Sequence, residues 1–217
     1  MPIISQLQAK FKKYFVPQIL ATIPSRFNGR IIVKDGFGSR YIHTDVAEVT
    51  QSGGIVNKLW LPVFKKIKPS PGKSWLVLGL AGGTVVRQIS QKFTPSRLVG
   101  VEIDPVMIDI GKKYFDLDKI PNLEIIQLDA KRYTLNAKDH FDYILVDLYI
   151  GDKIPAFTSQ PEFLDQLEQL GQLVIFNRLF YNSANKTSAQ EFVKLVGNHF
   201  SKTELVRSFA NLMIICE

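Results

Sequence analysis

Cysteine is almost missing from this sequence, since the only one is Cys216 in the final apolar run. A single thiol excludes a disulfide framework and fits a reducing cytoplasm. No apolar run approaches the roughly 18 residues that a membrane-spanning helix needs. Residues 1–15 place their lysines after apolar residues and contain no small-residue cleavage pattern. We therefore expect a cytoplasmic protein with neither a membrane span nor a signal peptide.

Histidine and, in the first third of the chain, acidic residues are also scarce. His43, His140 and His199 have no partners at the spacing of metal ligands, so we expect no metal site. Residues 1–73 hold 12 Lys or Arg against 3 Asp or Glu, whereas residues 74–217 hold 15 against 17. This basic region suits a solvated surface, and a nucleic-acid partner is the weaker alternative because no nucleic-acid-binding module accompanies it.

The chain divides near residue 70. Residues 3–15 carry apolar side chains at helical spacing, and residues 30–56 resemble strands around Gly-rich turns. A helix is predicted over residues 57–68, and Pro69 and Pro71 then interrupt the pattern. We expect an N-terminal helix and β-appendage in residues 1–70, followed by a main domain in residues 71–217.

The main domain alternates strands with helices. The predicted pairs of strand and helix are 75–79 with 83–92, 97–102 with 105–114, 123–128 with 130–137, 142–147 with 160–169, and 172–177 with 187–198. Two last strands, 202–209 and 211–216, form an antiparallel pair with a tight turn at residues 210–211. Repeated βα units predict an α/β fold with a doubly wound parallel sheet, closed here by an antiparallel strand. A class I methyltransferase fold, which is Rossmann-like, has this organisation.

Small residues follow the first predicted strand, in the run "GLAGGT" at residues 79–84. Ligands of such sheets bind beyond the carboxyl ends of the strands, where small residues let the backbone approach them. The run does not match the dinucleotide pattern of three glycines, because Ala81 and Thr84 occupy two of those positions. It resembles the glycine loop of methyltransferases instead, and it argues against a nicotinamide-dependent dehydrogenase.

Carboxylates end the next three strands. Glu102 lies 23 residues after Gly79, where a carboxylate can accept hydrogen bonds from both ribose hydroxyls. Asp129 follows the third strand, where this fold places the adenine amino group, although Asp129 also suits a helix cap. Asp147 follows the fourth strand, where it can orient an attacking amine or take its proton. Asp104 precedes Pro105, and we expect it to cap the following helix.

The segments "VLGLAGG", "VEIDP", "LDA", "FDYILVDLYIGD", "FTSQPEFLDQL" and "VTQSG" together resemble the spermidine synthase family of the class I methyltransferase superfamily. The resemblance implies a catalytic acid or base at Asp147 and a Gln51 that contacts the methionine-derived part of an adenosyl sulfonium. The residues that it implies for binding S-adenosylmethionine, or its decarboxylated form, are Gln51, Gly79, Leu80, Ala81, Gly82, Gly83, Glu102, Ile103, Asp129 and Ala130.

The chain departs from that family on the acceptor side. The family's Tyr-His-Glu run is absent after Gln51, and Ile150 stands where the family has a second acidic residue. Asp152 lies nearby but out of register. An acceptor such as putrescine carries two positive charges, so these losses favour a different acceptor or a different transferred group.

We expect a transferase, and two alternatives remain open. The expected function is methyl transfer from S-adenosylmethionine to a small-molecule acceptor or, as a variant, to RNA. The first alternative is aminopropyl transfer from decarboxylated S-adenosylmethionine. The second is a non-catalytic nucleoside-binding or scaffold protein, and a homodimer is compatible with all of them. We further expect Asn177 to line the pocket, and Trp60 and Trp75 to be core residues.

Overall fold

The computed structural model describes residues 16–44 and 50–217. Its first four strands form an antiparallel sheet in chain order: β1 (Gln18–Ser25), β2 (Gly29–Gly36), β3 (Ser39–Thr44) and β4 (Thr50–Gly53). The strands predicted around a Gly-rich turn are β2 and β3, whereas β1 was not predicted. The helix predicted over residues 3–15 and the β-structure predicted over residues 45–49 lie outside the described residues.

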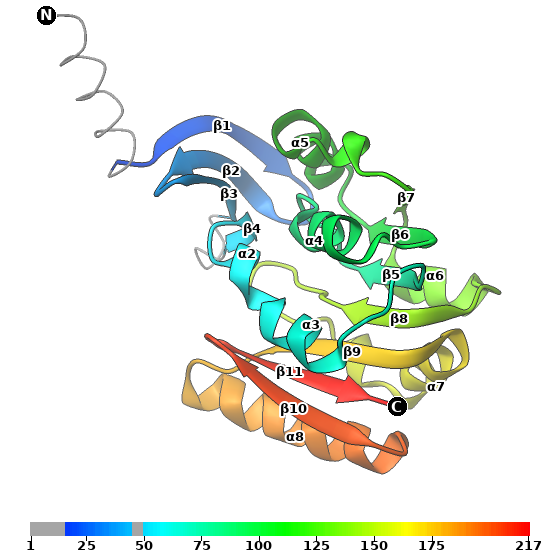
Figure 1. Cartoon of the computed structure of the whole chain (residues 1–217). Helices are drawn as coiled ribbons and strands as arrows, with labels where there is room; N and C mark the ends of the chain where they lie inside the picture. The colour runs from blue at the N-terminus through cyan, green and yellow to red at the C-terminus, as the bar shows by residue number, and fades with distance from the viewer. Residues whose placement is uncertain (1–15, 45–49) are drawn as a thin grey trace, which may run out of the picture.

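The second sheet has seven strands in the order β10-β11-β9-β8-β5-β6-β7 (Figure 1). Its strands are β5 (Ser74–Leu78), β6 (Arg97–Glu102), β7 (Leu123–Gln127), β8 (Phe141–Val146), β9 (Gly171–Leu179), β10 (Thr203–Ser208) and β11 (Asn211–Cys216). Strands β5 to β9 are parallel, and β11 runs antiparallel between β9 and β10. The predicted doubly wound sheet with an antiparallel strand is confirmed, and the strand order reverses between β5 and β8.

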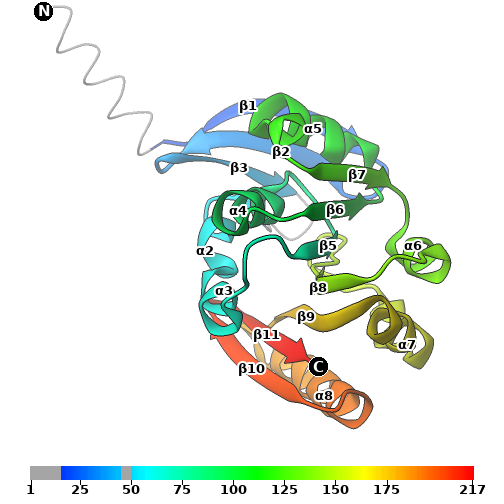
Figure 2. The ribbon, with the colours of Figure 1, turned by 45° about the vertical axis from the view of Figure 1, so that its right-hand side comes forward.

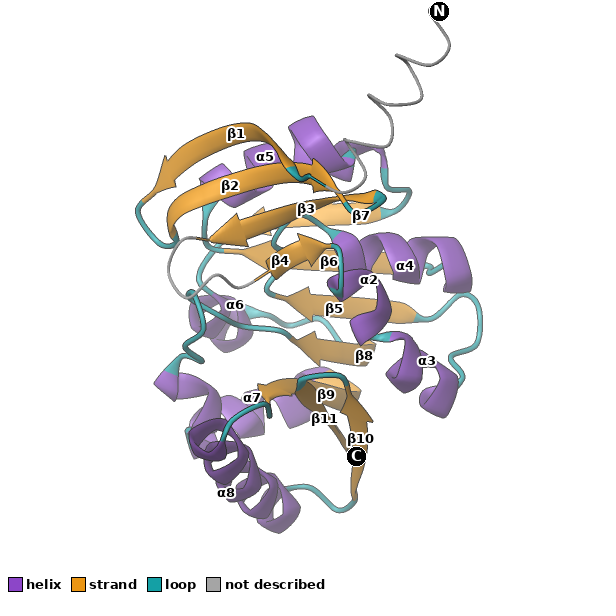
Figure 3. Cartoon of the chain, turned by 90° about the vertical axis from the view of Figure 1, so that its left-hand side faces the viewer, coloured by secondary structure: helices purple, strands orange, loops and turns teal. Residues whose placement is uncertain are grey.

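Helices cover both faces of this sheet (Figures 2 and 3). They are α2 (Val56–Leu59), α3 (Leu61–Ile67), α4 (Thr84–Phe93), α5 (Pro105–Phe115), α6 (Ala130–Asn136), α7 (Pro161–Leu170) and α8 (Ser183–His199), with short 3₁₀ helices η1 (Leu117–Lys119) and η2 (Ala156–Ser159). The alternation of β5 shows why two layers form. Leu76 and Leu78 pack with α6, α7 and α8, whereas Trp75 and Val77 pack with α3 and α4.

Three boundaries differ from the predicted ones. The helix predicted over residues 57–68 is broken at Trp60, which separates α2 from α3. Helix α8 begins at Ser183 rather than residue 187, because the side chain of Asn182 caps it by accepting from the Asn185 N–H. The final turn lies at residues 209–210, and Phe209 has a positive φ of 50° there.

The small sheet is fixed to the large one beside α5. Asp104 caps α5 by accepting from the Val106 N–H, as predicted. Its carboxylate also accepts from the hydroxyl of Ser25 and from Nδ2 of Asn28, both near the β1–β2 turn. A cluster that includes Ile31 and Ile42 of the small sheet and Met107 of α5 is buried between them. The boundary near residue 70 stays a prediction.

Part of the basic excess of the first 73 residues is paired within the chain. Lys66 contacts Glu204 at 2.7 Å, and Lys73 contacts Asp142 at 2.8 Å. Both acidic partners belong to the slightly acidic remainder of the sequence. The solvated-surface interpretation therefore has local support, and a nucleic-acid partner stays a prediction.

Candidate active site

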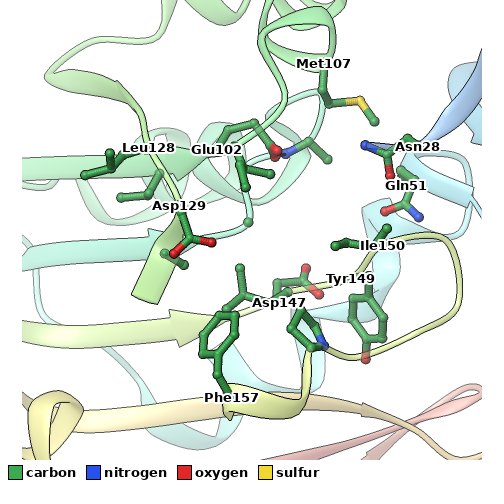
Figure 4. A pocket seen from close by; sticks show the side chains of 17 residues that line it. Asn28, Gln51, Glu102, Met107, Leu128, Asp129, Asp147, Tyr149, Ile150 and Phe157 are labelled. Atoms are coloured by element: carbon green, nitrogen blue, oxygen red, sulfur yellow. Dashed lines mark hydrogen bonds between the residues drawn. The ribbon is translucent and has the colours of Figure 1, made fainter. Parts of the chain in front are cut away.

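A first cavity of about 290 Å³ opens where β5, β6, β7 and β8 end, beneath the small sheet. Seven of the ten predicted binding residues line it: Gln51, Gly79, Ala81, Glu102, Ile103, Asp129 and Ala130. Asp147 lines it as well. Figure 4 shows Glu102, Asp129 and Asp147 around one space, with Asn28 and Gln51 reaching in from the small sheet. Strand ends far apart in the sequence thus present three carboxylates to one cavity.

Glu102 is held by the backbone at the end of β6. Its Oε2 accepts from the Ala81 N–H at 2.8 Å, and its Oε1 accepts from the Asp104 N–H at 3.0 Å. Burial raises the pKa of Glu102, and these two N–H groups oppose that rise. A carboxylate has about four acceptor positions, so each oxygen keeps one for a ligand. Glu102 is therefore oriented to accept two hydroxyl groups.

Contacts within the protein already require small residues in the glycine loop. Gly79 has a φ of 91°, and a Cβ there would overlap the carbonyl oxygen of Asp147 at the end of β8. Ala81, where methyltransferase loops have glycine, also has a positive φ of 46°. That conformation turns the Ala81 N–H toward Glu102. The close approach of two strand ends, in addition to any ligand, explains the small residues.

Three predicted binding residues lie outside the first cavity. Gly82 packs on the small sheet, where its N–H donates to Oγ of Ser52 at 2.9 Å, and it lines neither cavity of the site. Gly83 is the N-cap residue of α4 and has a φ of 86°, and a Cβ there would overlap Leu117. Leu80 is buried and lines only the second cavity, described below. Contacts within the protein therefore require a small residue at both positions, and a ligand contact of Gly82 or Gly83 stays a prediction.

Asp129 caps a helix, as predicted, and its carboxylate also reaches the cavity. It caps α6 by accepting from the Arg132 N–H at 3.0 Å through Oδ1. It also lines the first cavity, where Figure 4 shows its carboxylate at the edge opposite Asn28 and Gln51. The cap uses one oxygen and fixes the rotamer, so the other oxygen can face an amino group.

A second cavity of about 470 Å³ adjoins the first. Gln51, Gly79, Ala81, Asp147 and Tyr149 line both. The second cavity continues between α2, the end of β9 and the β10–β11 turn. Asp147 therefore stands at the junction of two spaces, which suits a reaction between two molecules.

Asp147 is held by two donors. Its Oδ1 accepts from Nδ2 of Asn177 at 2.8 Å, and its Oδ2 accepts from the indole N–H of Trp60 at 3.3 Å. Burial raises the pKa of Asp147 to about 6, against the opposing effect of these two donors. A carboxyl group with that pKa is mostly ionised at neutral pH and is basic enough to accept a proton. Asn177 lines the second cavity, as expected.

The sequence did not indicate the role of Trp60. It is fully buried, as predicted for a core residue, but its N–H also binds Asp147. The one available signal is general, since a buried indole N–H needs an acceptor. Trp75 is buried and stacks on Tyr143 and Phe93.

The segment after Asp147 forms one wall of the site. Ile150, where the resemblance implied a second carboxylate, lines the first cavity with an apolar side chain. Gly151 accepts from Nε2 of Gln51 at 3.2 Å, which joins this segment to β4. Asp152 lines neither cavity. Neither Ile150 nor Asp152 therefore presents a carboxylate to the two cavities.

Two residues that sequence reasoning missed support this wall. The Tyr149 hydroxyl donates to the Asn177 carbonyl oxygen at 2.9 Å. Arg178 is buried under η2, stacks on Phe192 at 3.4 Å and donates to Oγ1 of Thr158. Burial lowers the pKa of Arg178 to about 10. Arg178 thus holds η2, whose Phe157 lines the first cavity.

Metal ligands and membrane spans can be considered for residues 16–44 and 50–217. No three His, Cys, Asp or Glu side chains in these ranges gather in a way that could hold a metal ion. No helix of the same described part is long and apolar enough to cross a membrane.

Residues 61–191 match the model of the spermine/spermidine synthase domain family. A polyamine aminopropyltransferase of Vibrio vulnificus is 34% identical over 98 residues, which are 44% of this chain and 33% of that protein. An "eEF1A lysine and N-terminal methyltransferase homolog" of Drosophila pseudoobscura pseudoobscura is 30% identical over 93 residues, 42% of this chain and 14% of that protein. The matches thus span a third or less of these two relatives.

The fold has a close counterpart among solved structures. Spermidine synthase from Thermotoga maritima superposes with a TM-score of 0.72 at 16% identity, over 92% of this chain and 72% of that one. A likeness at this identity establishes the class I methyltransferase-like α/β fold. The family match covers more than half of the chain, from α3 into α8. The chain therefore belongs to the spermine/spermidine synthase domain family.

Proposed function

We propose that this protein transfers an aminopropyl group from decarboxylated S-adenosylmethionine to an amine. The charges of the two joined cavities carry the proposal. Glu102, Asp129 and Asp147 line them, and no Lys or Arg does so among the described residues. S-adenosylmethionine differs from its decarboxylated form by one carboxylate. Such a site lacks a countercharge for that carboxylate and suits the more cationic donor.

Each residue has a role in this proposal that its position supports. Glu102 accepts hydrogen bonds from the ribose hydroxyls, and Asp129 accepts one from the adenine amino group. Met107, Ile103 and Leu128 line the same cavity and supply apolar contacts to the adenine ring. Asp147 orients the acceptor amine and takes its proton, because it stands where the two cavities meet.

Methyl transfer from S-adenosylmethionine is the second candidate. The methyltransferase relative and the apolar Ile150 favour it, because a methyl acceptor needs no second carboxylate. The carboxylates that line the two cavities, with no Lys or Arg among the described lining residues, favour aminopropyl transfer over methyl transfer. A non-catalytic scaffold is the least supported function, since a purely structural carboxyl has no need of a pKa near 6 at the junction of two cavities.

Calorimetric titration of the full chain with each donor tests the proposal. We expect the decarboxylated form to bind at least about tenfold more tightly, since an unpaired buried carboxylate costs on the order of 1–3 kcal/mol. Tighter binding of S-adenosylmethionine would favour methyl transfer instead. Binding of neither donor would contradict both transferase functions.

A further inference from the structure

We propose that the acceptor is an apolar monoamine, whose nitrogen meets Asp147 and whose body fills the second cavity. This inference rests on the proposed aminopropyl transfer and specifies its acceptor. It follows from the size, lining and mouth of the second cavity.

The second cavity offers one charged partner. Asp147 is the single ionisable carboxylate among the described residues that line it. The remaining polar lining consists of hydroxyl and side-chain amide groups, among them Asn177 and Asn211. The side-chain amide groups of Asn177 and Asn211 are engaged with each other at 2.8 Å, and Asn177 also donates to Asp147. One ammonium can therefore be neutralised here, beside Asp147.

Apolar side chains make up much of the rest of the lining. Ile55 and Leu59 come from the α2 region, Leu179 from β9, and Phe209 from the β10–β11 turn. A volume of about 470 Å³ lies within the range of roughly 300–1,000 Å³ that holds drug-sized ligands. An aminopropyl tail with a four-carbon diamine has few atoms to fill this space or cover these walls. A larger apolar body would bury them.

Large apolar side chains also stand exposed at the mouth. Ile55, Tyr181 and Phe209 are 48%, 52% and 54% exposed, and all three line the second cavity. These side chains suit contact with the outer end of an apolar ligand.

The reaction balances without a further reactant. The lone pair of the amine nitrogen attacks the aminopropyl carbon that is bonded to the sulfonium sulfur, and a C–N bond forms. The C–S bond breaks, its electron pair stays on sulfur, and neutral 5′-methylthioadenosine leaves. Asp147 accepts the proton that the nitrogen loses and passes it to solvent.

A matched pair of acceptors separates this inference from ordinary polyamine synthesis. Hexylamine and 1,5-diaminopentane have the same chain length, but a methyl group in the first replaces the second ammonium. We expect kcat/KM for hexylamine to exceed that for the diamine at least about tenfold, because an ammonium among the apolar walls lacks a partner. The full chain is assayed with decarboxylated S-adenosylmethionine by release of methylthioadenosine, with 2-phenylethylamine and 1,4-diaminobutane as a second pair.

A variant at the mouth makes the test independent of absolute activity. Tyr181→Asp places a carboxylate at an exposed position. We expect it to raise the ratio of kcat/KM for the diamine to kcat/KM for the monoamine about threefold or more. Leu205→Asp is the control, because Leu205 is 52% exposed on β10 and lines neither cavity. Its ratio should stay at the wild-type value.

The possible outcomes are distinct. A preference of the wild type for either diamine overturns the monoamine inference, and so does an absence of turnover with both monoamines when the donor binds. A Tyr181→Asp ratio equal to that of the control contradicts the placement of the acceptor body. Failure of the donor to bind in calorimetry contradicts the proposed function itself.

Discussion

Replacement of Asp147 by Asn tests the centre of the site. The change keeps the size of the side chain and removes its proton acceptor. Because a positioned general base contributes about 10²–10⁴ in rate, we expect kcat to fall by that factor. Affinity for the donor should stay within about threefold, since the nucleoside contacts involve Glu102 and Asp129 instead.

The same change has a calculable effect on stability. Burial moves the pKa of Asp147 from 3.8 to about 6. At 1.36 kcal/mol per pKa unit this corresponds to about 3 kcal/mol. A carboxyl group whose pKa is raised by folding contributes fully to stability when the pH is below its pKa in the unfolded state. This contribution is lost as the pH rises through its folded pKa of about 6. Wild-type protein should therefore lose about 2.4 kcal/mol relative to Asp147→Asn between pH 4 and pH 7, because part of the roughly 3 kcal/mol is already lost at pH 4.

At any single pH, the difference in free energy of unfolding between wild type and Asp147→Asn is smaller than this change with pH. Asn offers one acceptor to the two donors of Asn177 and Trp60, and the unmatched donor costs about 1–3 kcal/mol at every pH. Urea unfolding of both proteins at pH 4.5, 5.5 and 7 isolates the part that depends on pH. A stability difference that is constant over this range would refute the burial argument. A wild-type rate that does not decline as pH falls through 6 would refute the general base.

Three further substitutions test the nucleoside side. Glu102→Gln should weaken methylthioadenosine binding about tenfold in calorimetry, whereas Glu124→Gln on the exposed side of β7 should not; equal losses would contradict the ribose contact. Gly79→Ala should lower the free energy of unfolding by about 3 kcal/mol or more, because its Cβ overlaps a backbone carbonyl. Gly72→Ala, with a φ of 76° but open space, should lower it by only about 1 kcal/mol, and similar losses would refute the steric argument. Ala81→Gly should raise stability by up to about 1 kcal/mol in the same assay, and a decrease would contradict strain at its φ of 46°.

The large sheet was predictable because its signals are local. Each buried parallel strand is a short apolar run, and each following helix has apolar residues at helical spacing. Some of these helices also have a recognisable N-cap, such as Asp104 before Pro105. The carboxyl ends of parallel strands meet at one edge, so Glu102, Asp129 and Asp147 could be placed together from their positions alone. Strand β1 was missed, since its side chains are largely exposed and its apolar pattern is weak.

The rest of the site depends on contacts between distant residues. Trp60 and Asp147 are 87 positions apart, and no local pattern joins an indole to a carboxylate over that separation. Gly82 and Gly83 fit the spacing of a ligand loop, yet their neighbours are Ile42, Ser52 and Leu117. A loop of glycines indicates a close approach, and only the fold shows which atoms approach.

The tie between Asp104 and the β1–β2 turn has a thermodynamic consequence. The walls of the first cavity come from both sheets and their turns. Gln51 lies in β4 and Asn28 in the β1–β2 turn, whereas Glu102 ends β6 and Asp147 follows β8. A ligand that contacts both sheets must also strengthen their association, by linkage. Amide hydrogen exchange in β1 to β4 should then slow when methylthioadenosine binds. The bound ligand raises the free energy needed to open these strands, although the large sheet provides most of its contacts.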